Sequence, residues 1–402
     1  MQNRIISQNS HYTFKYNSSL GRHGWLRLTP AYSVRLVEEI LNELDYKPEC
    51  VFEPFSGTGT TELVCANRGV KSFAFEINPF LVWFGNTKLK IYSGKILDEF
   101  LVSVKRIVSN IKNSKPSDLP PIYNFNRWWG DGQAEFLSKL KTSILNEENN
   151  IVQQLLWIAF CRTVIEFSNA AFNHVSTSFS DTNDYNFDID NGTEYFIAIC
   201  NMVLETARMQ PILNTKIYNI DSKNIPSMFN DSFDTVITSP PYPNRISYIR
   251  ELRPYMYWLD YLQTSEQAGE LDWSTIGGTW GKATSKLSTW NGNNDLPSYI
   301  YDLASKISNA ENKSSELMAN YVLKYFEDIQ LHLSSVFSRI KSKGKVHYII
   351  GNSNFYGVTV PSEKLYIDMM DNIGFINSEC RIVRKRNSNK QLYEYVVMAQ
   401  KP

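Results

Sequence analysis

The sequence predicts an α/β fold, in which a sheet of short buried strands is covered by helices and interrupted by two long insertions. Short apolar runs bounded by turn residues recur beside stretches of helical periodicity, which is the pattern of an α/β domain. The chain has 402 residues, of which 43% are hydrophobic and 20% charged. This length and composition are typical of a globular protein with a large core.

The strands can be justified in chain order. Cys50–Phe55 is an apolar run that leads through the turn SGTGT into a helix, and this helix is predicted to end at Gly69, a typical C-terminal cap. Ser72–Asn78 reads as the second strand. The later strands are Lys216–Asp221, Phe233–Ser239, Lys345–Ser353 and a closing hairpin of INSECRIVRKR and QLYEYVVMAQ.

Two insertions separate these strands. Residues 80–211 are rich in helical patterns and are predicted to form a helical insertion, whereas residues 262–315 are polar and contain Gly and Trp, as in a loop insertion. Residues 1–79, 212–261 and 316–402 remain as the core domain. A long amphipathic helix begins this last segment, and Gly344 is placed where its C-terminal cap is expected.

Charge, cysteine and histidine usage narrow the class of function. Lys plus Arg equals Asp plus Glu at 41 each, so a nucleic-acid partner must be held by local patches. The five cysteines contain no CxxC pair and the five histidines show no ligand-like spacing, so we expect no metal and no disulfide framework. The polar N-terminus and the lack of an apolar run of about 18 residues predict a cytoplasmic protein that does not enter a membrane.

The turn FEPFSGTGTT, residues 52–61, has the features of a cofactor loop. Gly57 and Gly59 allow the backbone to approach a ligand closely. The turn has no GK[ST], as a phosphate-binding P-loop would, and Glu62 stands where a dinucleotide fingerprint has its third glycine. Glu76 ends the next strand, where carboxylates accept hydrogen bonds from a ribose diol. A nucleoside cofactor without a pyrophosphate, such as S-adenosylmethionine, fits this pattern. Asp221 ends the third strand, either as an acceptor for an adenine amino group or as the cap of a turn.

Together with TSPPY, residues 238–242, this loop resembles the DNA amino-methyltransferases, which methylate exocyclic nitrogens of cytosine or adenine. The segment His23–Leu41 is similar to the motif that packs near the methionine part of the cofactor in that family. The resemblance implies a Rossmann-like class I methyltransferase sheet. It also implies that S-adenosylmethionine is bound by Thr29, Pro30, Glu53, Pro54, Phe55, Ser56, Gly57, Thr58, Gly59, Thr60, Thr61, Glu76, Asn78, Asp221 and Ser222.

Residues 239–242, SPPY, form a tetrad whose composition suits one kind of chemistry. An exocyclic amino nitrogen is a poor nucleophile, because its lone pair is delocalised into the aromatic ring, and acceptors fixed in advance on its N–H bonds free that lone pair. The resemblance implies that the Pro240 carbonyl is one acceptor and the Ser239 side chain the second. Pro241 helps to make the corner rigid, and Tyr242 stacks on a base flipped out of the duplex.

The resemblance leaves the substrate base open. Ser at the first tetrad position favours cytosine N4, and adenine N6 is the main alternative; an RNA methyltransferase and an inactive DNA-binding specificity subunit are further ones. The expected partner is double-stranded DNA, with a cognate restriction endonuclease that acts separately.

The order of motifs departs from the more common one in the family, because the glycine loop precedes the tetrad. Since the chain ends soon after its last hairpin, we expect the insertions to recognise DNA, with residues 262–315 as a mobile DNA-facing loop or a lid packed on the helical insertion. A basic turn at residues 381–390 is a further candidate patch. The individual candidates for DNA contact are Asn244, Arg245, Tyr248, Arg250, Arg253, Trp280, Lys282 and Trp290.

Overall fold

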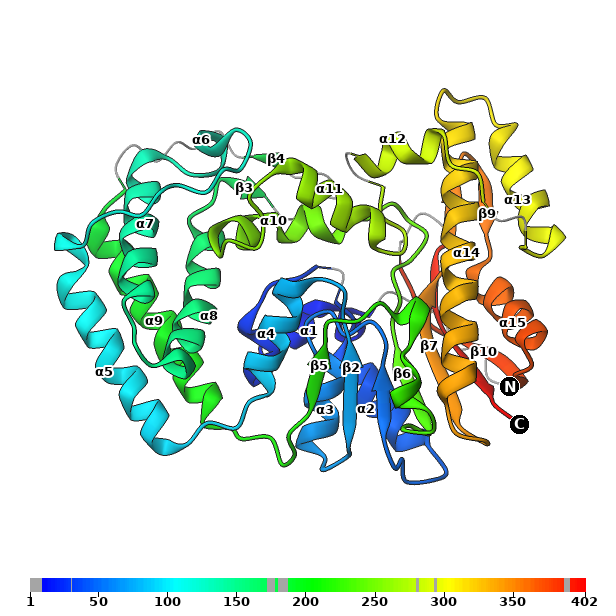
Figure 1. Ribbon diagram of the computed structural model, residues 1–402, viewed down its shortest axis with the longest axis horizontal. Coiled ribbons are helices and arrows are strands. Elements are labelled where there is room, and N and C mark those ends of the chain that lie inside the picture. Colours follow the sequence, from blue (N-terminus) through cyan, green and yellow to red (C-terminus); the bar gives the residue numbers. More distant parts are fainter. Residues whose placement is uncertain are drawn as a thin grey trace.

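A seven-stranded sheet lies at the centre of the fold (Figure 1). The structure is a computed structural model that describes residues 9–29, 31–171, 178–179, 187–279, 282–292, 295–386 and 391–402. From one edge to the other, the strands are β10 (Ile376–Lys385), β11 (Tyr393–Gln400), β7 (Lys345–Gly351), β6 (Thr235–Thr238), β1 (Val51–Glu53), β2 (Ser72–Phe75) and β5 (Lys216–Tyr218).

The strand directions define the class of fold. Neighbouring strands are parallel from β5 through β7, whereas β11 is antiparallel to both β7 and β10. This is the arrangement of a Rossmann-like class I methyltransferase sheet, so the predicted fold class is confirmed. Each predicted strand is present, and the helix after β1 is followed by Gly69 with a positive φ of 67°, as its predicted capping role requires.

The order of strands brings three segments to one edge. Val51 of β1 pairs with Ser72 of β2 on one side and with Thr235 of β6 on the other. In the sheet, β2 and then β5 lie on one side of β1, whereas β6 and then β7 lie on its other side. The strand order therefore reverses between β1 and β6, which flank the topological switch point of the sheet. Ligands of open α/β sheets bind outside the carboxyl ends of the strands at such a point. The glycine loop, Glu76 and the TSPPY corner all follow these carboxyl ends.

Helices cover both faces of the sheet. On one face, apolar side chains of α2 and α3 pack on β1, β6 and β7. On the other face, α13, α14 and α15 enclose an aromatic cluster in which the rings of Phe52 and Phe73 lie 4.9 Å apart. The bounds of these helices are α2 Val34–Glu43, α3 Thr60–Asn67, α13 Ser298–Ser308, α14 Ser315–Arg339 and α15 Ser362–Ile373.

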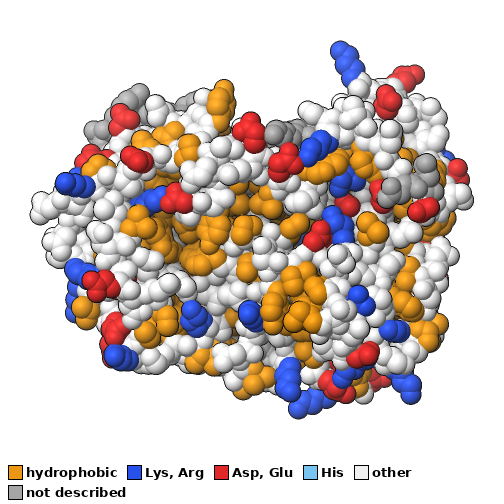
Figure 2. Space-filling view, in the orientation of Figure 1, with side chains coloured by type: hydrophobic (Ala, Val, Ile, Leu, Met, Phe, Trp, Pro, Cys, Tyr) orange, Lys and Arg blue, Asp and Glu red, His pale blue; other side chains and the backbone are white. Residues whose placement is uncertain are grey.

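Residues 80–211 form a helical lobe beside the sheet (Figure 1). Its core also takes in Trp25 and α10 (Tyr248–Trp258), the helix that follows the TSPPY corner. Figure 2 shows hydrophobic side chains gathered in the middle of one face, with charges of both signs mixed around them. The lobe's helices are α4 Pro79–Leu89, α5 Gly94–Asn110, α6 Phe125–Trp128, α7 Asp131–Leu145, α8 Asn150–Glu166 and α9 Ile189–Ala207.

The remaining elements are short and lie outside the central sheet. A small ladder joins β3 to β4, and a second joins β8 to β9. Their bounds, with that of the N-terminal helix, are α1 Phe14–Asn17, β3 Ala170–Ala171, β4 Ser178–Phe179, β8 Ser353–Phe355 and β9 Val358–Val360.

Two local predictions are wrong. Residues 262–315 are not a simple polar loop, because they contain α11 (Ser265–Ser274), α12 (Lys282–Ser288) and α13. Ile300 and Ile307 of α13 are fully buried in the core that α14 completes, so this segment is part of the sheet's covering layer. Gly344 is not a helix cap: α14 ends at Arg339, and Gly344 lies in a turn that leads into β7.

Candidate active site

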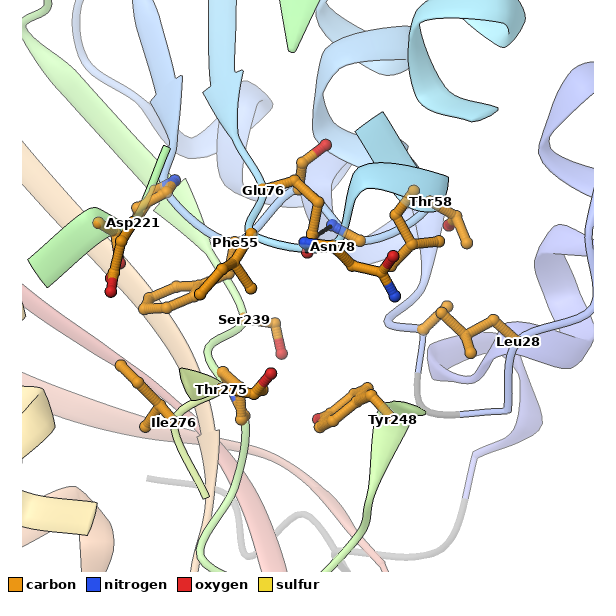
Figure 3. Close-up of a pocket in the computed structure, with 18 of the residues that line it drawn as sticks. Leu28, Phe55, Thr58, Glu76, Asn78, Asp221, Ser239, Tyr248, Thr275 and Ile276 are labelled. Carbon is orange, nitrogen blue, oxygen red and sulfur yellow. Dashed lines mark hydrogen bonds between the residues drawn. The ribbon is translucent and has the colours of Figure 1, made fainter. Parts of the chain in front are cut away.

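Two cavities meet at the carboxyl edge of the sheet. The inner cavity lies between the glycine loop, the ends of β2 and β5, and the diproline corner, and Figure 3 shows its side chains arranged around an open centre. The outer cavity lies between the N-terminal residues 9–15, the corner and the closing hairpin. Both cavities are lined by Ala31, Tyr32, Ser239 and Tyr248. Ser239 is therefore at the junction of the two cavities.

The glycine loop and Glu76 form one wall of the inner cavity. Gly57 and Gly59 have positive φ angles of 54° and 72°, a conformation in which any other residue type would be strained. The Gly57 N–H donates to Glu76 Oε2 at 2.9 Å, and the Asn78 N–H donates to Glu76 Oε1 at 2.8 Å. Each carboxylate oxygen thus keeps further acceptor capacity for a ligand. Burial raises the pKa of Glu76 to about 7, although the backbone N–H groups oppose this shift.

A second wall, which begins with Phe55 of the same loop, is apolar. Phe55, Ile220 and Ile276 line it, and the His332 ring supports Phe55 from behind at 4.6 Å between ring centroids. Asp221 lies at the end of this wall (Figure 3). Its carboxylate accepts a hydrogen bond from the Lys223 N–H at 3.0 Å, so Asp221 caps a turn and lines the cavity at the same time.

Most of the predicted cofactor residues come together around the inner cavity. Glu53, Gly59 and Thr61 do not line it, whereas Thr29 lines the outer cavity. Pro30 lies outside the described residues. The predicted residues that line the inner cavity are Pro54, Phe55, Ser56, Gly57, Thr58, Thr60, Glu76, Asn78, Asp221 and Ser222.

Glu53 turns away from the cavity and connects the elements behind it. Its carboxylate accepts hydrogen bonds from the Phe55 N–H at 2.9 Å, the Tyr32 hydroxyl at 2.6 Å and the Thr61 hydroxyl at 3.0 Å, and also from the Thr238 hydroxyl. Burial raises the pKa of this carboxyl, and the four donors oppose the shift. Glu53 therefore joins the end of β1 to the start of α3 and to the last residue of β6, and so fixes the glycine loop relative to the corner.

The diproline corner is held by contacts from α14. The Tyr325 hydroxyl donates to the Pro241 carbonyl at 2.8 Å. Among the described residues, no backbone N–H is hydrogen-bonded to the Pro240 carbonyl. Tyr242 donates its hydroxyl to Glu394 Oε1 at 2.9 Å, and the Arg386 guanidinium lies 5.1 Å from the centre of its ring. A Cβ on Gly351 would come within 1.9 Å of Arg386 Nη1 and 2.9 Å of Tyr242, so any larger residue here would force the arginine and the tyrosine ring to shift.

The predicted DNA-contact residues divide into two groups. Asn244 and Tyr248 line the outer cavity. Arg245, Arg250 and Arg253 line neither cavity. Arg245 is exposed to solvent.

Arg253 instead packs in the helical lobe. Its guanidinium lies 4.8 Å from the centre of the Trp128 ring, and burial lowers its pKa to about 10. Trp290 lines a separate cavity between α13 and α14. Trp280, the side chain of Lys282 and residues 387–390 of the basic turn lie outside the described residues.

Sequence reasoning missed several residues of the two cavities. Ser274, the last residue of α11, and the two residues that follow it, Thr275 and Ile276, line the inner cavity. The outer cavity takes Glu394 from the closing hairpin and Tyr12 from the N-terminus, and it also takes Arg384, which lies within the basic turn at residues 381–390 that was predicted from the sequence as a candidate patch. Tyr32 lines both cavities and was also missed. It lies within the segment His23–Leu41, so the resemblance of that segment to the family's cofactor motif was the signal that could have found it. No comparable signal marks Glu394.

Neither a metal site nor a membrane span is found in the part of the chain that the structure describes. Within those ranges, no three His, Cys, Asp or Glu side chains are grouped as metal ligands. No helix there is both long and apolar enough to cross a bilayer.

Comparison with known proteins identifies the kind of enzyme. No protein-family model matches the chain. The Type II methyltransferase M.BsoBI of Geobacillus stearothermophilus is 22% identical over 95% of this chain and 84% of its own length. The Type II methyltransferase M.MvaI of Kocuria varians is 23% identical over 79% of this chain and 73% of its own. This chain is a methyltransferase.

The predicted resemblance to the DNA amino-methyltransferases is thereby confirmed, and the cofactor of this methyltransferase is S-adenosylmethionine. The solved structure of TrmN from Thermus thermophilus covers 99% of this chain and 55% of its own at 10% identity, with a TM-score of 0.31. This value is low, so the assignment of the methyltransferase fold depends on the topology of the sheet itself.

Proposed function

We propose that this methyltransferase transfers a methyl group from S-adenosylmethionine to the N4 amino group of cytosine in a specific double-stranded DNA sequence, as the modification enzyme of a restriction–modification system. One observation carries the proposal: Ser239 borders both the inner and the outer cavity. A cofactor in the inner cavity and a base in the outer cavity would therefore meet at the tetrad. The relatives named above are Type II methyltransferases, which supports this setting.

The residues of the inner cavity fit the cofactor. The apolar wall of Phe55, Ile220 and Ile276 suits the faces of an adenine ring, with Asp221 as an acceptor at its edge. Glu76 has acceptor capacity for the ribose diol, and Thr58 and Thr60 offer hydroxyls to the amino-acid part. Bound S-adenosylmethionine supplies an electrophilic methyl group on a sulfonium.

The corner activates the target amine. The Pro240 carbonyl and Ser239 Oγ accept hydrogen bonds from the two N–H groups of the exocyclic nitrogen, which draws the nitrogen towards tetrahedral geometry. This stabilises the transition state only when the acceptors are fixed beforehand. The two prolines and the hydrogen bond from Tyr325 to Pro241 fix them here. Glu53 holds Thr238, the residue before the tetrad, and so adds to the same rigidity.

Tyr242 and Tyr248 serve the base. Both line the outer cavity, where a base flipped out of the duplex would enter. Stacking on an aromatic ring is worth about 1–3 kcal/mol per base, which offsets part of the cost of flipping. Arg386 lies over the Tyr242 ring, so the tyrosine has one ring face supported by protein.

Nucleoside analysis tests the proposal. Unmethylated genomic DNA is incubated with the protein and with S-adenosylmethionine labelled in the methyl group, then digested to nucleosides and separated. We expect the label in N4-methylcytosine and its loss with Ser239→Ala. Label in N6-methyladenine would show that adenine is the substrate, and label in RNA alone would overturn the DNA assignment. A protein that incorporates no label but binds DNA would be a specificity subunit.

A further inference from the structure

A chain of polar contacts leads from the closing hairpin to the tetrad. Arg384 of β10 forms an ion pair with Glu394 of β11, with Nε 2.7 Å from Oε2 and Nη2 3.3 Å from Oε1. Glu394 Oε1 accepts the hydroxyl proton of Tyr242 at 2.9 Å. Ser239 Oγ lies 3.4 Å from the same tyrosine oxygen, a long contact that can only be weak. The ion pair is largely buried, with 17% of the Arg384 side chain and 6% of the Glu394 side chain exposed.

The direction of each hydrogen bond in this chain follows from the groups present. Arg384 is a donor only and an ionised carboxylate is an acceptor only, so Tyr242 has to donate its single proton to Glu394. Burial and the negative charge of Glu394 raise the pKa of Tyr242 well above its ordinary value, so the phenol keeps that proton at neutral pH. The phenol oxygen is then left as an acceptor towards Ser239.

This direction decides what Ser239 can offer in the outer cavity. A serine hydroxyl has one proton and two lone pairs. With its proton turned towards Tyr242, the lone pairs face away from the tyrosine, towards the junction of the two cavities. With its proton turned into the outer cavity, the hydroxyl would present a donor to the N–H bonds of the substrate amine, and the two donors would repel one another.

We propose that Glu394 is a positioning residue that, through Tyr242, turns the Ser239 hydroxyl into an acceptor for the exocyclic amine of the substrate. This inference rests on the function proposed above and adds a role for two hairpin residues, Arg384 and Glu394, that lie more than one hundred residues after the tetrad in the sequence. Arg384 pairs with the Glu394 carboxylate and orients it so that its Oε1 faces Tyr242.

An isosteric substitution tests the polarity of the chain. In Glu394→Gln the guanidinium of Arg384 attracts the amide oxygen, so the amide NH₂ turns towards Tyr242 and the hydrogen bonds reverse. We expect the single-turnover rate of methyl transfer to fall on the order of tenfold, because one acceptor in the transition state is replaced by a donor. The dissociation constant for S-adenosylhomocysteine should not change, since Glu394 does not line the inner cavity.

A double-mutant comparison separates this role from a merely structural one. Tyr242→Phe keeps an aromatic ring but cuts the chain, so adding Glu394→Gln to Tyr242→Phe should change the rate by less than about twofold. The matched control is Glu147→Gln, because Glu147 is also a buried carboxylate paired with an arginine, Arg106, but lies in the helical lobe. Glu147→Gln should leave the rate unchanged, and thermal unfolding of each variant reports any loss of fold.

The outcomes distinguish this inference from the proposed function. A wild-type rate for Glu394→Gln, or an equal fall in the Tyr242→Phe background, would overturn the positioning role while leaving the proposed function intact. A full rate for Ser239→Ala would overturn the positioning role of Glu394 together with the acceptor role of Ser239, because the amine would then not need the Ser239 acceptor. The proposed function fails separately, when the nucleoside analysis finds no label in N4-methylcytosine. A fall in rate with Glu394→Gln that disappears in the Tyr242→Phe background supports the inference.

Discussion

Replacing Glu76 by Gln should weaken cofactor binding far more than the small change in shape suggests. Both carboxylate oxygens already accept a backbone N–H, from Gly57 at 2.9 Å and from Asn78 at 2.8 Å. A glutamine has one oxygen, so its NH₂ group has to face one of these donors. The glycine loop then loses a charge-assisted hydrogen bond, and the ribose diol loses a charged acceptor.

The size of the effect follows from these contacts. A hydrogen bond to a charged group contributes about 1.5–3 kcal/mol, so the loss of the diol contact and the disturbed loop together should cost about 3 kcal/mol. Since about 1.4 kcal/mol corresponds to a factor of ten, the dissociation constant should rise on the order of 100-fold. Isothermal titration calorimetry with S-adenosylhomocysteine measures it directly.

Glu62→Gln is the matched control for this experiment. Glu62 is a fully buried carboxyl of α3, close to the glycine loop, but it does not line the inner cavity. Its substitution should leave the dissociation constant within about threefold of the wild-type value. The reasoning about Glu76 would be refuted if Glu76→Gln also bound S-adenosylhomocysteine within about threefold of wild type.

Three further predictions concern the same site. Burial raises the pKa of Glu76 to about 7, and in the proposed complex the ribose diol of the cofactor donates to the ionised carboxylate. The cofactor should therefore bind more weakly as the pH falls below about 7 and with constant affinity well above it. Calorimetry from pH 5.5 to 9 checks this, and an affinity that rises on acidification would contradict it. Gly351→Ala forces its Cβ against Arg386 and Tyr242. It should lower the rate of methyl transfer more than the affinity for S-adenosylhomocysteine. Equal losses of rate and affinity would argue against a local effect on the corner. Tyr325→Phe removes the donor to the Pro241 carbonyl. It should reduce kcat by about 5- to 10-fold at unchanged cofactor affinity, as expected for a lost hydrogen bond of roughly 1 kcal/mol. Steady-state kinetics would show an unaltered kcat if the two prolines alone keep the corner rigid.

The sheet and its ligand-binding edge could be predicted because their signals are local. Each strand is an apolar run bounded by turn residues. Glu76 comes directly after β2 and Asp221 three residues after β5, so parallel pairing places both at one edge. That the Glu53 side chain turns away from the inner cavity could not be predicted in this way. The strand that carries it is buried on both faces, so alternation along the strand does not show which side chains reach the cavity.

Other parts of the site depend on contacts between distant segments. Glu394 and Tyr242 are 152 positions apart, and nothing near either residue indicates their hydrogen bond. The helices of residues 262–315 were hidden because the apolar positions of α13 are spread among polar residues, so composition suggested a loop. Arg253 was predicted to contact DNA, but α10 directs it to Trp128 in the helical lobe.

The central claim is that cofactor and substrate meet at Ser239, and a crystal structure with bound S-adenosylhomocysteine tests it most directly. We expect the ribose diol within about 3 Å of the Glu76 carboxylate, the adenine against Phe55, and the sulfur at the junction of the two cavities beside Ser239. A ligand bound with its sulfur directed away from Ser239, or seated outside the inner cavity, would contradict the claim.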